Sequence, residues 1–331
     1  MDSNTPRLYG MNIELTTACP LRCPQCYCSL EGGKHISLQT AVKYLKQAKA
    51  LGLKHVELSG GETLCYPHLY DLIREATVLG IDSNIAISGW HFNEEVLQKL
   101  KDAGLSHIFV SLNGPTEELN ARSRDGYEYA ISALKILKES DFSEVYINWV
   151  MHRDTADYLP DMIQLAQEYN VKAIVIMAPK PTSKHELHTL PTKEQMERTV
   201  QLIRTNRPGF LTVESCFSPL LAMASDTKFL GNLNVGLFKG CSAGRTMLSV
   251  SVDGLLSPCR HLEYFEKWDS LEEYWMNSPI LRKIRGLEDN KKEPCASCKY
   301  SKYCRHCLAV NSKLNNDLYI GNELCALAEK Q

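Results

Sequence analysis

Thirteen cysteines constrain the fold and chemistry of this 331-residue chain more than any other feature. Residues 1–15 contain polar side chains and Pro6 where a secretory signal would need an apolar run. Without an export signal, a chain of this length is not expected to use its cysteines as a disulfide framework. The cysteines therefore predict metal binding in a reducing, cytoplasmic compartment.

Composition excludes several classes of protein. With 44% apolar and 23% charged residues, the chain can bury a sizeable core. A formal net charge of -2 lacks the basic excess expected of a nucleic-acid-binding protein. No apolar run approaches the roughly 18 residues that would cross a membrane. We therefore expect a globular protein that binds neither nucleic acid nor membrane.

The first two thirds of the chain alternate short apolar runs with amphipathic segments, a pattern typical of βα units around a parallel sheet. We predict six such units, which would form a partial (β/α)6 barrel of the TIM type. The predicted strands are 8–15, 54–59, 84–88, 107–112, 145–151 and 173–177, and the predicted helices are 37–51, 67–79, 93–103, 127–139, 158–169 and 193–205.

This rhythm ends after Arg207, and eight of the thirteen cysteines follow. We predict a barrel over residues 1–207, a linking region over 208–238 and a small cysteine-rich domain over 239–331. Within the last domain, Asp253-Gly254 between two apolar runs predicts a hairpin over 247–259.

Cys19, Cys23 and Cys26 place three thiols within eight residues, directly after the first predicted strand. A structural zinc site normally has a fourth Cys or His ligand. Three thiolates suit a four-iron four-sulfur cluster that keeps one iron open for an exogenous ligand. The cluster interpretation is favoured, and a zinc-binding or buried cysteine loop is the alternative.

The C-x3-C-x2-C loop followed by Tyr27 resembles that of the radical S-adenosylmethionine (SAM) enzymes. Ser59-Gly60-Gly61-Glu62 stands where this family has a Gly-Gly-Glu motif that holds the methionine amine of SAM. The resemblance implies that Tyr27 packs near the adenine. It also implies that SAM is contacted by Gly60, Gly61, Glu62, Ser88, Ser111, Asn113 and one of Arg122 and Arg124.

The C-terminal cysteines resemble the SPASM domain, which carries two auxiliary four-iron four-sulfur clusters. The matching positions are Cys241, Cys259, Cys295, Cys298, Cys304, Cys307 and Cys325. By this resemblance the outer cluster is held by Cys295, Cys298, Cys304 and Cys325, and the inner one by Cys241, Cys259 and Cys307. A zinc knuckle over 295–307 is the alternative, but it leaves the other three cysteines unexplained.

Three cysteines fall outside both patterns: Cys28, Cys65 and Cys216. Seven ligands are one short of the eight that two clusters need. Cys216 could complete the inner cluster, or one iron could stay open. Cys65, just after the Gly-Gly-Glu motif, could donate a hydrogen atom to a substrate radical, although a small buried residue is the more common role of such a cysteine.

The resemblance implies an enzyme that cleaves SAM to a 5′-deoxyadenosyl radical and oxidatively crosslinks side chains of a ribosomally made peptide through a C–C, ether or thioether bond. It also implies a flavodoxin- or ferredoxin-type electron donor and three clusters. Too few residues are expected before the first strand for a leader-binding domain, so a leader would bind at the barrel mouth or to a separate leader-binding protein, or the substrate has no leader. The alternatives are a maturase of a haem or quinone precursor, a peptide epimerase and, outside enzymes, an iron-sulfur electron carrier.

Overall fold

The computed structural model describes residues 6–225, 240–301, 304–321, 325 and 327. They divide into two compact units. The first comprises Met1–Leu112, Thr116–Tyr146 and Ala243–Ile284, and the second comprises Asn113–Pro115, Ile147–Ser242 and Arg285–Gln331. The predicted domain limits at 207 and 239 stay predictions, and residues 226–238 of the predicted linking region lie outside the described residues.

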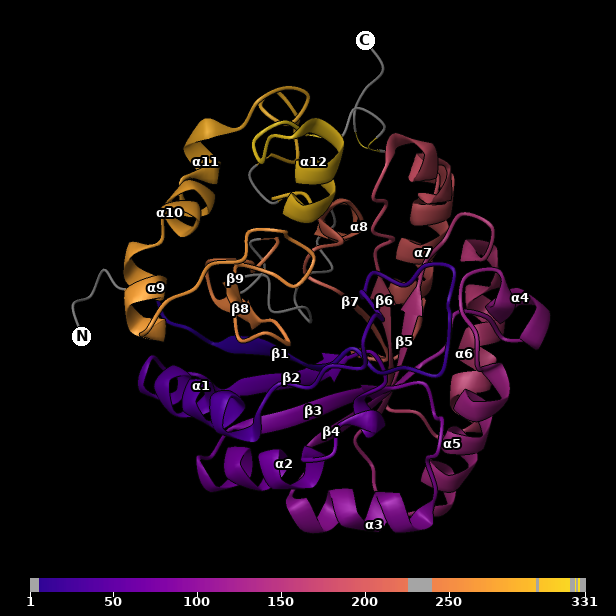
Figure 1. Ribbon diagram of the computed structural model, residues 1–331. Helices are drawn as coiled ribbons and strands as arrows, with labels where there is room; N and C mark the ends of the chain where they lie inside the picture. The colour runs from indigo at the N-terminus through magenta and orange to yellow at the C-terminus, as the bar shows by residue number, and fades with distance from the viewer. Residues whose placement is uncertain (1–5, 226–239, 302–303, 322–324, 326, 328–331) are drawn as a thin grey trace. The chain divides into compact units, whose positions relative to one another are not determined.

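The first unit is built on parallel strands in the order β4-β3-β2-β1-β8, with β9 antiparallel to β8 at one edge (Figure 1). The strands are β1 (Gly10–Thr16), β2 (His55–Gly60), β3 (Asp82–Ile87), β4 (His107–Ser111), β8 (Met247–Val250) and β9 (Leu256–Ser257). The four predicted strands of this unit are present with ends shifted by no more than two residues. The predicted hairpin over 247–259 is also present.

The hairpin also extends the parallel sheet, because its strand β8 pairs with β1, which the sequence did not indicate. Gly10 of β1 aligns with His55 of β2 on one side and with Met247 of β8 on the other. The turn between β8 and β9 uses Gly254 at φ +76°, and its N–H donates to the Ser251 carbonyl at 2.9 Å. Glycine takes this left-handed backbone without steric cost.

Helices cover one face of these strands, and Figure 1 shows α1, α2 and α3 side by side there. Ser37 and Asn93 cap α1 and α3 by accepting hydrogen bonds from backbone N–H groups of the first turn. The helices of this unit are α1 (Leu38–Ala50), α2 (Leu69–Val78), α3 (Glu94–Ala103), α4 (Glu117–Ala121), α5 (Tyr127–Glu139) and α9 (Leu271–Asn277), with the 3-10 turn η1 at Thr63–Cys65 and most of α10 (Pro279–Arg285).

Alternation along β1 separates the core from the polar face of the sheet. Met11, Ile13 and Leu15 are at most 1% exposed and pack into the hydrophobic core. Asn12 and Glu14 point to the opposite face because successive side chains of a strand alternate. This second face carries polar residues, and on it Asn12 Nδ2 donates to Ser59 Oγ of β2 at 2.8 Å.

The second unit carries three strands in the order β5-β6-β7, and β6 pairs in parallel with β7 through Ile174 and Leu211. Its strands are β5 (Val145–Val150, of which 147–150 belong to this unit), β6 (Ala173–Met177) and β7 (Leu211–Val213). Its helices are α6 (Leu159–Glu168), α7 (Lys193–Thr205), α8 (Ser218–Ser225), α11 (Leu287–Asn290) and α12 (Leu308–Asn315), with 3-10 turns η2 (Ala156–Tyr158) and η3 (Lys184–Thr189).

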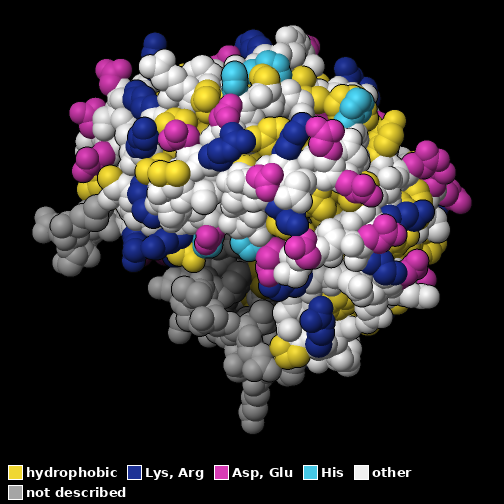
Figure 2. All heavy atoms as spheres, turned by 90° about the horizontal axis from the view of Figure 1, so that it is seen from below, with side chains coloured by type: hydrophobic (Ala, Val, Ile, Leu, Met, Phe, Trp, Pro, Cys, Tyr) yellow, Lys and Arg dark blue, Asp and Glu magenta, His cyan; other side chains and the backbone are white. Residues whose placement is uncertain are grey.

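All six predicted strands and six predicted helices are therefore present, and the fold is the predicted α/β type in which parallel strands alternate with helices, as in a partial TIM barrel. Figure 2 shows one face of the molecule, on which cationic and anionic side chains are interspersed. Within the part of the chain that the structure describes, no helix has the length and apolar character to cross a membrane.

Candidate functional site

The three-cysteine loop leaves the end of β1 and is held by backbone hydrogen bonds. Cys26 N–H donates to the Cys23 carbonyl at 3.0 Å. Asp125 binds this loop twice, since its N–H donates to Cys23 Sγ at 3.4 Å and its carboxylate accepts from Arg22 N–H at 2.9 Å. The loop is thus tied to the segment that precedes α5, a hundred residues away in the chain.

Cys26 has the electrostatic environment of a metal-binding thiolate. A hydrogen bond with Cys28 lowers the pKa of Cys26 to about 6, and the Arg124 and Arg22 cations add to the effect. Burial instead raises the pKa of Cys19 to about 11. Thiolates are the metal-binding form of cysteine, so a cluster would take up Cys19 with release of its proton.

The Gly-Gly-Glu motif lies directly against this loop. Gly61 N–H donates to the Thr16 carbonyl at 2.7 Å, and Glu62 N–H donates to the Ala18 carbonyl at 2.8 Å. A Cβ atom at Gly61 would lie 2.3 Å from the Ala18 carbonyl oxygen, closer than any side chain can approach. The two glycines therefore let the end of β2 meet the cysteine loop without an intervening side chain.

Glu62 and Ser88 meet at the carboxyl ends of β2 and β3. The Glu62 side chain accepts hydrogen bonds from Ser88 N–H at 2.9 Å, Ser88 Oγ at 2.5 Å and Leu64 N–H at 3.2 Å. Glu62 is only 2% exposed, and burial raises its pKa even though these hydrogen bonds oppose the shift. The structure thus brings together two of the predicted SAM-contacting residues.

Arg124 and Arg122 have different surroundings, although the sequence left the choice between them open. Arg124 lies close enough to Glu62 and Cys26 to lower the pKa of both. Its Nε is buried and has no hydrogen-bond partner among the described residues. Arg122 is exposed and pairs with Glu118 at 3.4 Å on α4. The buried, unsatisfied donor makes Arg124 the better candidate for binding an anionic cofactor group.

No contact links the other residues predicted to bind SAM or substrate with Ser88 or Arg124, among the interactions given for the described residues. Asn113 is 1% exposed, and its Oδ1 accepts from Val150 N–H at 3.1 Å, so this side chain fixes the backbone of β5. Ser111 ends β4 and is half-buried. Cys28 donates to the Gly60 carbonyl at 3.1 Å, and half-buried Cys65 ends the turn η1 beside Glu62. Roles of these residues toward SAM or substrate stay predictions.

Tyr27 has neighbours that sequence reasoning missed. Its ring lies 4.3 Å from the His261 ring at 58°, and the Arg260 guanidinium carbon lies 5.3 Å from its centre. Arg260 also pairs with Glu57 of β2 at 2.9 Å. Arg260 follows Cys259 directly, and this position after a predicted cluster ligand was the only signal in the sequence.

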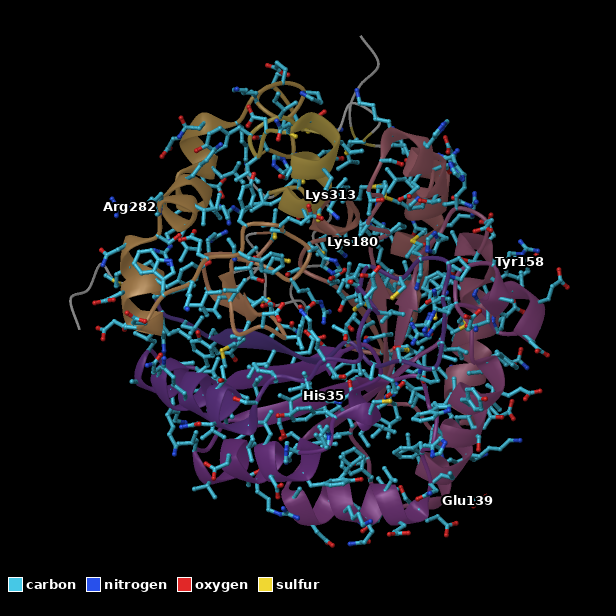
Figure 3. The ribbon with its side chains drawn as sticks, in the orientation of Figure 1. His35, Glu139, Tyr158, Lys180, Arg282 and Lys313 are labelled. Atoms are coloured by element: carbon cyan, nitrogen blue, oxygen red, sulfur yellow. The ribbon has the colours of Figure 1, made fainter. Side chains whose placement is uncertain are left out.

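In the second unit, a buried polar group surrounds Cys216. Lys180, labelled in Figure 3, follows β6 and pairs with Glu214 at 2.9 Å. A hydrogen bond with Cys216 lowers the pKa of Cys307 to about 6, and Lys180 contributes to that shift. Cys216 and Cys307 are therefore neighbours, which supports Cys216 as an inner-cluster ligand over an open iron. Cys241 is buried, and its carbonyl accepts from Arg305 at 3.1 Å.

The cysteines predicted to hold the outer cluster also lie beside a buried cation. Lys291 Nζ donates to the carbonyls of Ser301 at 2.5 Å and Cys304 at 3.1 Å, and its side chain is 5% exposed. Gly321 leaves room for Cys295, because a Cβ there would lie 2.2 Å from the Cys295 sulfur. Within the described parts of the chain, which include all thirteen cysteines, no three potential ligands are already arranged as a metal site.

Comparison with known families gives the chemistry of the first site. Residues 13–166, from β1 through most of α6, match the radical SAM superfamily. This part of the chain is a radical SAM domain. The matched segment contains the cysteine loop, the Gly-Gly-Glu motif, Ser88 and Arg124, so a three-thiolate four-iron four-sulfur cluster and SAM fit the donor set. Two observations are the structural evidence for that fit. Gly60 and Gly61, named here the glycine cradle, leave no side chain between the end of β2 and the cysteine loop, and the Arg124 Nε is unsatisfied among the described residues.

Similar proteins span most of the chain. The PqqA peptide cyclase of Rhodopseudomonas palustris is 28% identical over 96% of this chain and 86% of its own length. The AdoMet-dependent heme synthase of Methanosarcina barkeri is 26% identical over 93% of this chain and 92% of its own length.

Solved structures show the same fold. SuiB of Streptococcus suis, bound to S-adenosylmethionine, aligns with a TM-score of 0.77 and 18% identity over 97% of this chain and 78% of its own. The protein anSMEcpe, with bound AdoMet and a peptide, aligns with a TM-score of 0.72 and 15% identity over 96% of this chain and 93% of its own.

Proposed function

We propose that this radical SAM enzyme oxidatively modifies a ribosomally made peptide by joining side chains through a C–C, ether or thioether bond. The observation that carries the proposal is the meeting of the three-thiol loop, the glycine cradle and the Glu62–Ser88–Arg124 group in one unit. The peptide as substrate is supported by the likeness to PqqA peptide cyclases over nearly the full chain.

When bound, the reduced cluster and SAM supply a carbon-centred radical that abstracts hydrogen from a substrate C–H bond. The chain's own residues would bind the cluster and SAM and orient them toward the substrate. Cys19, Cys23 and Cys26 would hold three irons, while the Glu62 carboxylate and the backbone at Gly60 and Gly61 would bind the cofactor amine. Arg124 would pair with the cofactor carboxylate, because its buried Nε has no hydrogen-bond partner among the residues that the structure describes.

We extend the proposal to two auxiliary clusters. Cys295, Cys298, Cys304 and Cys325 would hold the outer cluster, and Cys216, Cys241, Cys259 and Cys307 the inner one. The neighbouring thiols of Cys216 and Cys307 support the inner set. Auxiliary clusters would accept the electron that an oxidative crosslink releases. A flavodoxin- or ferredoxin-type protein would supply reducing electrons in the cytoplasm, and a separate protein would present the peptide leader.

A second function is favoured by one comparison. The likeness to an AdoMet-dependent heme synthase spans 92% of that protein, so a haem precursor is the alternative substrate. Both functions need the same SAM site. They differ in the molecule that the radical attacks.

Oxygen-free reconstitution followed by a substrate screen tests the proposal. The protein, SAM and dithionite are incubated with precursor peptides encoded near the gene, or with haem precursors. We expect 5′-deoxyadenosine formation to rise with one peptide, whose mass falls by two hydrogen atoms. A Cys19, Cys23, Cys26 triple-alanine variant is the matched control and should form no 5′-deoxyadenosine.

Stimulation by a haem precursor but by no peptide would overturn the peptide proposal in favour of the second function. Absence of any 5′-deoxyadenosine from a chain that carries iron and sulfide would overturn both.

A further inference from the structure

Arg260 is a half-buried cation at the polar face of the first unit. Its side chain is 14% exposed, and the Glu57 carboxylate that it pairs with at 2.9 Å is 24% exposed. The same Nη1 donates to Ser59 Oγ at 3.0 Å. A guanidinium in such a setting is fixed in place, because releasing it would leave Glu57 buried without a counter-charge.

Ser59 connects Arg260 to neighbouring strands of the sheet through hydrogen bonds. Asn12 Nδ2 of β1 donates to Ser59 Oγ of β2 at 2.8 Å, and Ser249 Oγ of β8 donates to Asn12 Oδ1 at 3.1 Å. The network therefore joins three neighbouring strands of the parallel sheet. Arg260 binds to rigid strands rather than to a loop.

Arg260 and His261 both lie against the Tyr27 ring. The His261 ring lies 4.3 Å from the Tyr27 ring, and the Arg260 guanidinium carbon lies 5.3 Å from its centre. Both distances are within the range of aromatic and cation–π attraction. Tyr27 is still 39% exposed, so part of its surface is free for another ring.

The segment that carries Arg260 begins with Cys259. His261 N–H donates to Cys259 Sγ at 3.5 Å, and Ser257 Oγ donates to the Cys259 carbonyl at 2.9 Å. Ser257 belongs to β9, whose hairpin is attached to the sheet through β8. A three-residue segment thus runs from a proposed auxiliary-cluster ligand to the ring that follows the cysteine loop.

We propose that Arg260 and His261 are positioning residues that hold Tyr27 against the adenine of SAM, so that ligation of Cys259 by its cluster strengthens SAM binding. This inference rests on the proposed function for the presence of SAM and of the inner cluster. It assigns to the Cys259–His261 segment a coupling between the two cofactor sites. The coupling is carried by contacts and does not require electron transfer.

SAM binding to the reconstituted protein tests this coupling. Equilibrium dialysis would compare the wild-type chain with Arg260→Gln, Arg260→Lys and Tyr27→Leu, and iron per chain would be counted for each. We expect Arg260→Gln to raise the Kd for SAM about tenfold. Arg260→Lys keeps the charge but loses the planar guanidinium, so the Kd for SAM should rise less than in Arg260→Gln. This variant keeps the test informative if Arg260→Gln fails to fold.

A double-variant cycle separates positioning from general destabilisation. If Arg260 acts through Tyr27, Arg260→Gln should add little to the effect of Tyr27→Leu. Cys259→Ala should also raise the Kd several-fold while the iron of the first cluster is retained. Arg74→Gln, which removes a surface ion pair with Asp71, is the matched control and should leave the Kd unchanged.

Additive effects in the cycle, or a Kd within twofold of wild type for Arg260→Gln, would overturn the inference. A wild-type chain that binds SAM but modifies no peptide would contradict the proposed function alone, because dialysis needs no substrate. A wild-type chain that binds no SAM would overturn both.

Discussion

The cysteine loop near the start of the chain and the cysteine-rich segment near its end are built differently. The first is held by hydrogen bonds from strand ends, including Gly61 N–H to Thr16 at 2.7 Å and Glu62 N–H to Ala18 at 2.8 Å. The second lies between the short helices α11 and α12, where backbone hydrogen bonds mostly close local turns, such as Cys304 N–H to the Tyr300 carbonyl at 2.9 Å, and the Lys291 amine binds backbone carbonyls.

We therefore expect the first cysteine loop to keep its fold without metal, whereas the second cysteine region would depend on metal binding for part of its fold. Around the first loop, Glu62 and Ser88 are already paired before any cofactor binds. Around the second, irregular backbone would be organised by thiolate–iron bonds, because metal binding and local folding share one free energy. The predictions below test this contrast.

Replacing one ligand in each region should give the largest and most distinct effects. If the three proposed clusters form, Cys23→Ala should abolish SAM cleavage and remove about four irons of about twelve, since three thiolates would hold the first cluster. We expect Cys298→Ala to remove a similar amount of iron, keep SAM cleavage in the absence of substrate and lower protection of residues 287–315 from hydrogen exchange.

Hydrogen exchange with mass spectrometry is the deciding measurement. After Cys23→Ala, protection of β1 and β2 should persist, because their backbone bonds do not depend on iron. Equal loss of protection around both clusters would contradict the contrast.

The buried pair of Lys180 and Glu214 gives the next effect. Lys180→Met would leave the Glu214 carboxylate buried beside Cys216 without its cation, at a cost of about 3–5 kcal/mol in the free energy of unfolding. Adding Glu214→Gln to Lys180→Met should recover most of that stability. Urea unfolding would measure both, and a double variant no more stable than Lys180→Met would show that the charge is not the cause.

The glycine cradle should contribute less. Gly61→Ala would place a Cβ 2.3 Å from the Ala18 carbonyl, and relieving such overpacking costs about 1–3 kcal/mol. Gly10→Ala is the matched control within β1, because its Cβ would meet no atom closer than 3.8 Å. Thermal unfolding of the apo chains compares them. Equal melting temperatures for the two variants would show that the close approach is not needed.

The sequence predicted the barrel well because its strands are buried on a regular pattern. Strand β6 at 173–177 and helices α5 and α7 have the predicted limits. The three-residue strand β7 was missed, since so short a run carries no periodicity. The pairing of β8 with β1 was also missed, because strand neighbours 237 residues apart leave no local signal, as Gly10 and Met247 illustrate.

The site was predicted as far as motifs reach. The family resemblance implied that Glu62 and Ser88 both contact SAM, and the structure joins them by two hydrogen bonds. Arg260 was not found, because its partner Glu57 lies 203 positions earlier and only the fold brings the two charges together. The ion pair of Lys180 and Glu214 was not predicted for the same reason, because such a pair is a property of tertiary structure.

The smallest effect concerns two arginines that the sequence did not distinguish. Arg124→Gln should raise the Kd for SAM about tenfold, a typical loss for one charge-assisted hydrogen bond to a carboxylate. Arg122→Gln should leave it unchanged, because Arg122 is exposed and its ion pair with Glu118 is solvated. Isothermal titration of the reconstituted proteins with SAM would measure both. Equal losses would mean that the net charge of this segment governs binding, whereas a loss confined to Arg124 would assign it to the buried Nε beside Glu62.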